Sequence, residues 1–408
     1  MGKIKEINDD EDKYNIAILH PDLGIGGAER LIVDVALGLK SCGHKIDVYT
    51  SRHDPTRCFR ETANGDLNVK VCGDYFPRHF LNRFMVICAI IRNLLAAIHI
   101  IFFSKKHLSP LFKWFTKSKV LFYCHFPDKL LTSRNSTIKR LYRVPIDLFE
   151  EWTTSCADEI LVNSNFTSSI FKKSFTHIKK SPNVLYPCLN TVEFDKTKQS
   201  SDFSNQTKYN NKPISLENKE FFLSINRYER KKDLKLALDS FSVVYSNNPN
   251  KDIYLVFAGG YDTGLKENVE HLEELKEKTK EYGLEDRVFF LCSINEGQKQ
   301  WLLLNCCCLV YTPSFEHFGI TPLEGMYASK PVIAVNNGGP LETVVDSKTG
   351  FLCPPDQKDF SEAFQKIISD PLHSKKMGFA GKQRVNEKFS FKPFANNLNT
   401  ISNNLMIN

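Results

Sequence analysis

The sequence lacks the features that mark secreted, metal-binding or nucleic-acid-binding proteins. The residues up to Lys13 are charged and contain no apolar core of a secretion signal. The 12 cysteines show no paired metal-binding spacing, and most lie in apolar runs, which favours free buried thiols in a reducing compartment. The net charge of +7 is modest, and no polyanion-binding motif accompanies it. We therefore expect a chain whose bulk is cytosolic and whose partners include no nucleic acid.

With 408 residues, the chain is longer than one hydrophobic core usually serves, so two domains are expected. Apolar runs of strand length alternate with helical stretches in both halves, which predicts an α/β fold of two doubly wound, Rossmann-like domains. A polar segment rich in Ser, Asn and Lys separates them. The predicted parts are a charged tail at 1–13, a first domain at 14–195, a linker or disordered insertion at 196–219, and a second domain at 220–408.

A glycine-rich turn follows the first predicted strand, 15–20. Gly26 and Gly27 let the backbone approach a phosphate, whose charge the N-terminus of a helix from Ala28 would favour. A dinucleotide-binding fingerprint would have a further glycine where Glu29 stands, which argues against NAD or FAD.

A nearly unbroken apolar stretch covers 84–103, with Arg92 close to its middle. A membrane-spanning helix would hold this arginine at the bilayer centre, at a cost of about 2.5–3.5 kcal/mol. An in-plane or half-inserted helix fits better, with the lysine-rich segment 105–119 on an anionic membrane surface. A buried core helix is the structural alternative.

Two glutamates in the stretch 311–329, Glu316 and Glu324, have seven residues between them. Thr321 is predicted as an N-cap and Pro322 as the first helical residue, which places the second glutamate near a helix start. That glutamate is either a capping-box carboxylate or a ligand for a ribose diol. Glu316 favours the functional interpretation, because nothing structural requires an acid in a loop between aromatic residues.

Cations and a histidine follow predicted strands, at the sheet edge where α/β proteins bind ligands. Arg227 and Lys232 follow the strand 221–225, and His125 follows the strand 120–124. A basic run is often only a solvated surface, and a glycine pair only a turn. Together, however, the cations, carboxylates and glycine turns describe a site for a nucleotide diphosphate sugar. The glycines in the predicted donor-binding set are Gly26, Gly27, Gly319, Gly338 and Gly339.

Several long stretches resemble one known family. They include HPDLGIGGAERLIVDVALGL, VLFYCHFPDKLLT, INRYERKKDLKLAL and PSFEHFGITPLEGMYASKPVIAVNNGGPLETV. The chain resembles the retaining GT-B glycosyltransferases that carry a Glu-x7-Glu motif. Within them it is most similar to the mannosyltransferases that add the second and third mannoses to the dolichol-linked oligosaccharide for asparagine-linked glycosylation.

The resemblance implies GDP-mannose as donor and mannosylated chitobiose diphosphate dolichol as acceptor, with an α1,3 and then an α1,6 bond formed with retention. It also implies the cytosolic face of the endoplasmic reticulum membrane, and it admits other mannosyltransferases of the pathway as partners. The choice of guanine over uracil rests on the resemblance alone.

The resemblance also implies roles for individual residues. Arg227 and Lys232 would stabilise the departing GDP. Glu324 would hold the ribose, and Glu316 would lie beside the transferred sugar. His125, with the amides of Gly26 and Gly27, would meet the sugar and phosphates from the first domain. The resemblance makes that domain, 14–195, the acceptor side and the second domain, 220–408, the donor-binding side.

Neither cleft-facing stretch contains an Asp-x-Asp pair, so we expect catalysis without a metal or cofactor, by fixed cations in a water-poor site. The family's first domain carries a further strand with an Asp-Gln pair that this chain lacks. Either 98–103 serves as that strand or a piece of the sheet is missing. A glycosyltransferase with a soluble acceptor and a non-catalytic partner of the pathway remain as alternatives.

Overall fold

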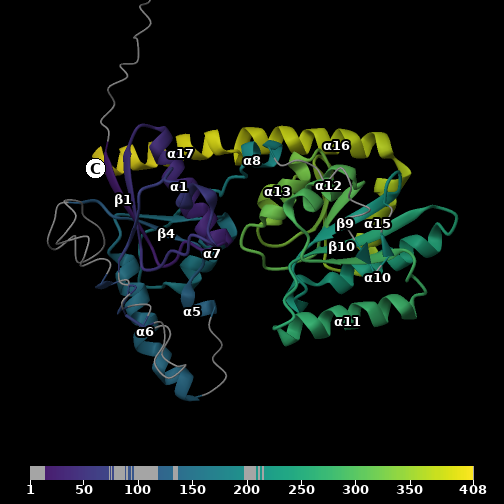
Figure 1. Ribbon diagram of the computed structural model, residues 1–408, viewed down its shortest axis with the longest axis horizontal. Helices are drawn as coiled ribbons and strands as arrows, with labels where there is room; N and C mark the ends of the chain where they lie inside the picture. Colours follow the sequence, from purple (N-terminus) through teal and green to yellow (C-terminus); the bar gives the residue numbers. More distant parts are fainter. Residues whose placement is uncertain are drawn as a thin grey trace, which may run out of the picture. The chain divides into compact units, whose positions relative to one another are not determined.

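The computed structural model describes residues 14–72, 74, 76–77, 88, 91–92, 94–95, 118–131, 137–196, 208–209, 212–213 and 216–407. The chain divides into two compact units (Figure 1). Unit 1 comprises Met1–Asn163, Thr167–Cys188 and Phe391–Asn408, and unit 2 comprises Ser164–Phe166 and Leu189–Ser390.

Unit 1 contains six described strands in two parallel sheets of three, ordered β1-β2-β3 and β4-β5-β6. The two sheets contribute to one core, in which Leu161 and Leu185 join Ile18, Leu31 and Val48. The sequence predicted β1, β2, β4, β5 and β6 as short runs between turns, but it did not predict β3. The strands are β1 (Asn15–His20), β2 (Lys45–Thr50), β3 (Val69–Val71), β4 (Leu121–Cys124), β5 (Glu159–Val162) and β6 (Asn183–Val184).

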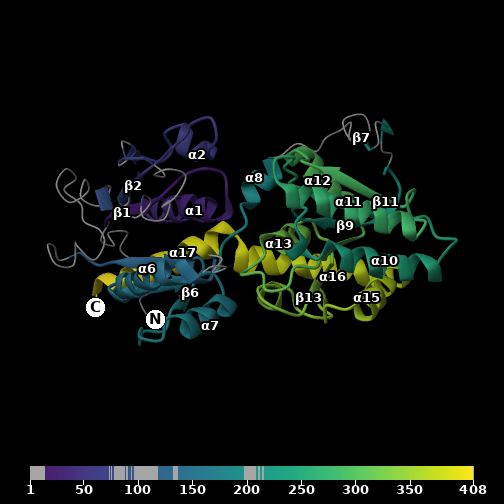
Figure 2. The same cartoon turned by 90° about the horizontal axis from the view of Figure 1, so that it is seen from below.

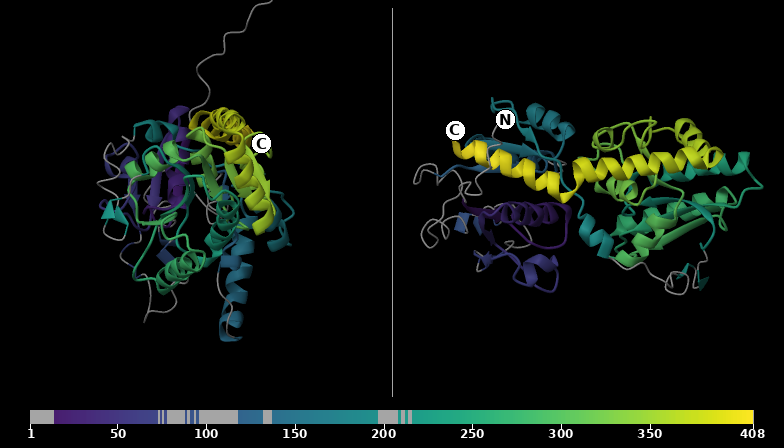
Figure 3. Two further views of the ribbon diagram at one scale, coloured as in Figure 1. Left: turned by 90° about the vertical axis from the view of Figure 1, so that its right-hand side faces the viewer. Right: turned by 90° about the horizontal axis from the view of Figure 1, so that it is seen from above.

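The last helix of the chain, α17 (Phe391–Ile407), packs against α1 (Gly27–Ser41) in unit 1 (Figure 1 and Figure 3). A Cβ at Gly38 would lie 3.4 Å from the Cβ of Ala395, so the two helices touch with almost no side chain between them. The structure thus departs from the expected second domain at 220–408, because the apolar face of α17 completes the core of unit 1. The other helices of this half are α2 (Arg60–Ala63), α5 (Asp128–Leu131), α6 (Thr137–Ser155) and α7 (Asn165–Ser174).

Unit 2 is built on six parallel strands in the order β11-β10-β9-β12-β13-β14. Of these, β9, β11 and β13 are labelled in Figure 2. The strand order reverses between β9 and β12, which makes the carboxyl ends of these two strands the topological switch point of the sheet. The strand β14 was not predicted, because its four residues follow a turn with no clear alternation. The strands are β9 (Glu220–Ile225), β10 (Ile253–Gly259), β11 (Val288–Cys292), β12 (Cys308–Tyr311), β13 (Val332–Val335) and β14 (Gly350–Cys353).

Helices cover both faces of this sheet. On one face Phe222 of β9 packs against Phe241 and Phe364. On the other, the rings of Phe221 and Trp301 stack with centroids 6.3 Å apart. Two faces covered by helices confirm the predicted doubly wound architecture. The helices are α8 (Thr191–Lys196), η1 (Arg230–Lys232), α10 (Leu234–Asn247), α11 (Lys266–Glu281), α12 (Glu296–Asn305), α13 (Ile320–Tyr327), α14 (Pro340–Thr343), α15 (Gln357–Ser369), α16 (Pro371–Arg384) and the π-helical turn η2 (Val385–Phe389).

The polar segment 196–219 is not wholly without structure. It contains a short antiparallel pair, β7 (Lys208–Tyr209) with β8 (Lys212–Pro213). The residues 197–207, 210–211 and 214–215 lie outside those that the structure describes.

Most of the apolar stretch 84–103 also lies outside the described residues, as do 105–117 and the candidate strand 98–103. Within the stretch, Arg92 is described. It is 5% exposed, and its Nη2 donates to the carbonyl of Ser51 and pairs with Asp74 Oδ1, both at 2.5 Å. The arginine therefore faces protein, which is what the core-helix alternative requires at this position. Among the described residues no helix is both long and apolar enough to cross a membrane.

Candidate active site

An ion pair lies at the switch point of the unit 2 sheet. The chain leaves β9, makes the turn η1 and ends it at Lys232, while Glu316 follows β12. Lys232 Nζ lies 2.5 Å from Glu316 Oε2. The Thr312 hydroxyl donates to the Lys232 carbonyl at 2.7 Å, which fastens the two loops to each other. The sequence predicted both residues, and the fold brings them into contact.

The pair is largely shielded from solvent, with 13% of the Lys232 side chain and 26% of the Glu316 side chain exposed. Burial by itself would raise the pKa of Glu316. The Lys232 ammonium and a hydrogen bond from Tyr311 more than offset that effect, so the pKa of Glu316 lies below its ordinary value. The site thus holds an ionised carboxylate and a lysine of fixed position.

Arg227 has a different environment from Lys232, although the sequence grouped them. Its side chain is 60% exposed, and its Nη1 lies 2.8 Å from Glu229 Oε1. Lys231 Nζ pairs with the other oxygen of the same carboxylate, at 3.0 Å. Because the guanidinium is open to solvent, it can reorient toward a ligand, whereas Lys232 is held by Glu316.

Three glycines shape the loop that carries Glu316. Gly338 and Gly319 have φ angles of 65° and 80°, which side-chain-bearing residues rarely adopt. A Cβ at Gly338 would lie 2.5 Å from the Glu316 carbonyl oxygen, and one at Gly339 would lie 2.1 Å from that of Phe318. The Gly339 amide donates to the Glu316 carbonyl at 2.8 Å. These glycines therefore set the position of the Glu316 backbone, which gives them a role beyond a plain turn.

The helix that carries Glu324 begins earlier than predicted. The helix α13 starts at Ile320, and Gly319 is its N-cap, with no side-chain cap hydrogen bond. The predicted N-cap at Thr321 was therefore wrong. Pro322 is the third residue of the helix. Backbone N–H groups in the first turn have no intrahelical acceptor, so a proline, which has no N–H, is tolerated there. The capping-box alternative for Glu324 was also wrong, because this residue lies five residues after the N-cap Gly319 and a capping box requires three.

Glu324 instead pairs with a lysine that the sequence gave no reason to select. Lys299 Nζ of α12 lies 2.8 Å from Glu324 Oε1 and 3.3 Å from Glu296 Oε2. Burial raises the pKa of Glu324, and Lys299 opposes that rise. Burial would lower the pKa of Lys299, but the two carboxylates raise it, so the lysine stays charged. Only the fold reveals this contact, because α12 and α13 are separate helices.

Unit 1 presents two histidines at its sheet edge. His20 ends β1 and His125 follows β4, with ring centroids 6.4 Å apart in an edge-to-face arrangement. Burial lowers the pKa of His125 to about 4, and His20 adds to the effect. The His125 imidazole is therefore neutral near pH 7. The sequence identified His125 and missed His20, which looked like the end of an apolar strand.

The glycine turn of unit 1 is not strained. Gly26 is the N-cap of α1 with a φ of −167°, which is extended backbone. A Cβ at Gly27 would meet nothing within 4 Å, and one at Gly26 would meet only the flexible end of the Glu29 side chain. Gly27 therefore leaves open space that a ligand in contact with its amide would need, whereas the Glu29 carboxylate occupies the space beside Gly26.

Models of two families match this chain. "Glycosyltransferase Family 4" matches residues 25–191, and "Glycosyl transferases group 1" matches residues 205–384. Two solved structures share the fold: a glycosyltransferase from Rickettsia africae (TM-score 0.72, 19% identity, 98% of this chain and 100% of that one), and a sucrose-phosphate synthase from Thermosynechococcus elongatus (TM-score 0.70, 19% identity, 97% and 99%). The fold and the site define a GT-B glycosyltransferase.

Sequence relatives narrow this class. The alpha-1,3/1,6-mannosyltransferase ALG2 of Dictyostelium discoideum is 74% identical over 96% of this chain and 98% of its own length. The protein of the same name from Mus musculus is 47% identical, over 94% of each chain. The chain belongs to the alpha-1,3/1,6-mannosyltransferase ALG2 family.

Proposed function

We propose that the protein transfers mannose from GDP-mannose to mannosylated chitobiose diphosphate dolichol, forming an α1,3 bond and then an α1,6 bond with retention. The observation that carries this proposal is the 74% identity, over almost the whole chain, to an alpha-1,3/1,6-mannosyltransferase. The ion pair of Lys232 and Glu316 at the switch point of the sheet supports it, because that point is where open α/β sheets bind nucleotides.

In the proposed reaction, the acceptor hydroxyl oxygen forms a bond to the anomeric carbon of mannose while the bond from that carbon to the diphosphate breaks. Negative charge develops on the departing GDP, which takes the proton of the acceptor hydroxyl. Lys232 and Arg227 are the cations that stabilise this charge. Since Lys232 is fixed before the donor arrives, little reorganisation is needed during reaction, which is how preorganised charges lower a barrier. Arg227, being 60% exposed, closes on the diphosphate from solvent.

The two carboxylates have separate tasks in this proposal. Glu316, ionised and held by Lys232, lies beside the transferred sugar, where its charge favours a positive anomeric carbon. Glu324 accepts hydrogen bonds from the ribose diol, and Lys299 orients its carboxylate. Gly319, Gly338 and Gly339 position the loop between them. His125, neutral near pH 7, and the Gly26 and Gly27 amides serve the sugar and phosphates on the side of unit 1.

We further propose that the enzyme works at the cytosolic face of the endoplasmic reticulum membrane, beside other mannosyltransferases of the same pathway. A dolichol tail stays in the bilayer, so an enzyme for this acceptor must reach the headgroup region. The family relation and the apolar stretch 84–103 support this location.

One assay tests the proposal. Membranes that carry the protein are incubated with GDP-mannose and with lipid-linked acceptors bearing one or two mannoses, and the mass and linkage of the products are determined. We expect an α1,3 product followed by an α1,6 product. Transfer from a uridine donor in place of GDP-mannose, or transfer only to a water-soluble acceptor, would refute the assignment.

A further inference from the structure

One carboxylate of unit 2 lies beside the cations assigned to the donor diphosphate, and the reaction described above does not use it. Glu229 stands in the loop between β9 and η1, between Arg227 and Lys232 in the chain. Its Oε1 lies 2.8 Å from Arg227 Nη1, and its Oε2 lies 3.0 Å from Lys231 Nζ. One carboxylate therefore holds two cations of a loop that also serves a negatively charged ligand.

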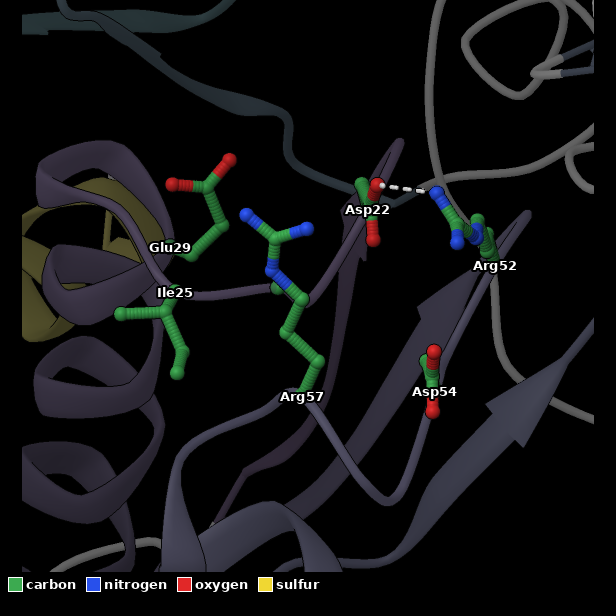
Figure 4. Close-up of a pocket in the computed structure, with 7 residues that line it drawn as sticks. Asp22, Ile25, Glu29, Arg52, Asp54 and Arg57 are labelled. Carbon is green, nitrogen blue, oxygen red and sulfur yellow. Dashed lines mark ion pairs between the residues drawn. The ribbon is translucent and has the colours of Figure 1, made fainter. Parts of the chain in front are cut away.

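Burial distinguishes Glu229 from the carboxylates of a mixed-charge pocket in unit 1 (Figure 4). That pocket lies between the loop that joins β1 to α1 and the loop that follows β2. In it, Arg52 Nη1 lies 3.6 Å from Asp22 Oδ2, and the Asp22 side chain is 44% exposed. The Glu229 side chain is only 9% exposed, so water screens its charge less and it acts more strongly on neighbouring charges.

The backbone holds Glu229 in place. Its amide donates to the Arg227 carbonyl at 2.8 Å, and its carbonyl accepts from the Lys232 amide at 2.9 Å. The preceding residue, Tyr228, is fully buried, and its hydroxyl lies 3.3 Å from carbonyl oxygens of β10 and β11. The Arg227 and Lys231 side chains, in contrast, are 60% and 67% exposed. The carboxylate is therefore fixed, whereas the two cations that it holds can reorient.

Arg227 and Lys231 can turn to a diphosphate only by leaving Glu229. Each cation then exchanges one anionic partner for another, so the carboxylate and the diphosphate compete for the same charges. Because Glu229 is fixed and shielded, it stays near the bound diphosphate and repels it. The carboxylate thus weakens the hold of this loop on its ligand.

This repulsion differs between the donor and the product. In GDP-mannose the terminal phosphate is linked to the sugar. In GDP that phosphate has a second ionisation at about pH 6, so GDP carries roughly one more negative charge near neutral pH. Cations alone would therefore retain the product more tightly than the donor, because Coulomb energy grows with ligand charge. A fixed carboxylate offsets this preference for the same reason.

We propose that Glu229 promotes the release of GDP after each transfer by competing with its diphosphate for Arg227 and Lys231. The inference rests on the proposed function, since it takes GDP to be the product. It gives the carboxylate a role after the chemical step, when the cations that stabilised the departing group must let it go. An enzyme that forms two bonds in succession needs this release before the second donor can bind.

The test compares the affinities of product and donor in Glu229→Gln, which removes the charge at nearly constant size. GDP is titrated into the full-length protein in detergent, its dissociation rate is measured, and the Michaelis constant for GDP-mannose is determined with the lipid-linked acceptor. We expect the variant to bind GDP about tenfold more tightly, mainly through slower dissociation. The Michaelis constant for GDP-mannose should fall by about threefold or less, because the donor carries less charge.

Two further variants complete the test. Glu229→Asp keeps the charge but draws it back from the cations, so it should tighten GDP binding less than glutamine does. It also carries the test if the glutamine variant folds poorly. Glu270→Gln is the matched control, because it removes a carboxylate of α11 that pairs with Arg230 and Lys266 in place of the two cations held by Glu229. It should bind GDP and GDP-mannose as wild type does.

Weaker binding of GDP to Glu229→Gln would overturn the inference, since Glu229 would then hold Arg227 ready for the ligand. Unchanged GDP affinity in the glutamine and aspartate variants, or equal tightening of GDP and GDP-mannose, would overturn it too. Failure of the proposed function looks different. In that case wild type would bind no GDP and transfer no mannose from GDP-mannose, whereas here wild type does both and only the selective effect of the Glu229 variants is missing.

Discussion

The sheets of the two units place polar groups at their carboxyl edges in different ways. In unit 2 the charges are paired, shielded and held by glycines that tolerate no Cβ, as for Lys232 with Glu316 beside Gly339. In unit 1 the edge presents the neutral His125, a loosely paired Arg52 and a Gly27 with open space around it.

The difference shows what each edge is suited to bind. A rigid set of charges matches a charged group of fixed shape, since preorganised charges act most strongly on charge that develops in one place. A roomier edge with a neutral histidine suits a ligand rich in hydroxyls, which is bound by many weak contacts. The following predictions test this contrast, beginning with the largest expected effect.

Gly339→Ala should damage unit 2 far more than Gly27→Ala damages unit 1. The new Cβ would lie 2.1 Å from the Phe318 carbonyl oxygen, so the Glu316 loop must move. We expect a loss of about 3 kcal/mol in unfolding free energy, the upper end for overpacking. A shift of the Glu316 loop by about 1 Å would reduce turnover about a hundredfold. Thermal unfolding and steady-state kinetics measure both effects. Equal stabilities of the two variants would contradict the contrast.

Lys232→Met and Arg227→Met should separate stability from catalysis within unit 2. Both should reduce turnover about a hundredfold to a thousandfold, as expected when one charge-stabilising group is removed. Lys232→Met should also lower the unfolding free energy by about 1 kcal/mol, because Glu316 loses its partner in a shielded place. Arg227→Met should leave stability within about 0.5 kcal/mol, because its side chain is 60% exposed. Denaturant titration measures the unfolding free energy of both variants. Equal destabilisation would contradict the expectation that the buried lysine contributes more to stability than the exposed arginine.

Lys299→Met should make donor binding dependent on pH. Burial raises the pKa of Glu324, and Lys299 limits that rise, with Glu296 and Tyr311 as the other titratable groups nearby. Without the lysine, the pKa of Glu324 rises further and less of the ionised form is present near neutral pH. We therefore expect the Michaelis constant for GDP-mannose to increase by about tenfold at pH 6.5 and to recover as the pH rises. Lys299→Arg should behave nearly as wild type. If the Michaelis constant increased by the same factor at all pH values, Lys299 would act through packing and not through the charge of Glu324.

The effect of His125→Gln on stability should be the smallest of these near neutral pH and should appear only in acid. The pKa of His125 is lowered to about 4 from an ordinary 6.5, so the folded state prefers the neutral ring. Stability from this group is complete above pH 6.5 and is lost as the pH falls toward 4, by at most about 1.4 kcal/mol per pH unit. The glutamine variant should therefore show a flatter fall in melting temperature between pH 7 and 5. A fall as steep as that of wild type would mean that other groups dominate the acid response.

Most strands could be predicted from the sequence, because buried parallel strands are short apolar runs that end in turns. The predicted run 15–20 coincides with β1, and the predicted run 221–225 lies within β9. The sequence also indicated that Glu316 and Lys232 lie at the carboxyl edge of the sheet, since each stands in the segment that follows such a strand. The predicted start of α13 was wrong because the loop ends at Gly319, which has a positive φ, two residues before Thr321. The side-chain pattern does not indicate this backbone angle.

Contacts between helices or loops that are distant in the sequence could not be predicted from the sequence. Lys299 is an ordinary polar residue in the first turns of α12, and only the packing of α12 beside α13 brings it to Glu324. The pocket of unit 1 depends in the same way on two loops that meet in space. The packing of α17 against unit 1 was not predicted. Its apolar residues, such as Phe394 and Leu398, indicate a buried face, but they do not indicate which unit buries it.

The packing of α17 against unit 1 has a consequence for how the protein is made. Phe394 and Leu398 belong to the hydrophobic core of unit 1, yet the ribosome synthesises them only after the whole of unit 2. The first unit therefore emerges with a gap on the surface of α1 where α17 later packs. While the roughly two hundred residues of unit 2 are translated, Gly38 on α1 lacks the neighbours Phe394 and Ala395 that cover it in the complete fold. Until that helix arrives, the newly made unit exposes an apolar strip that chaperones would recognise.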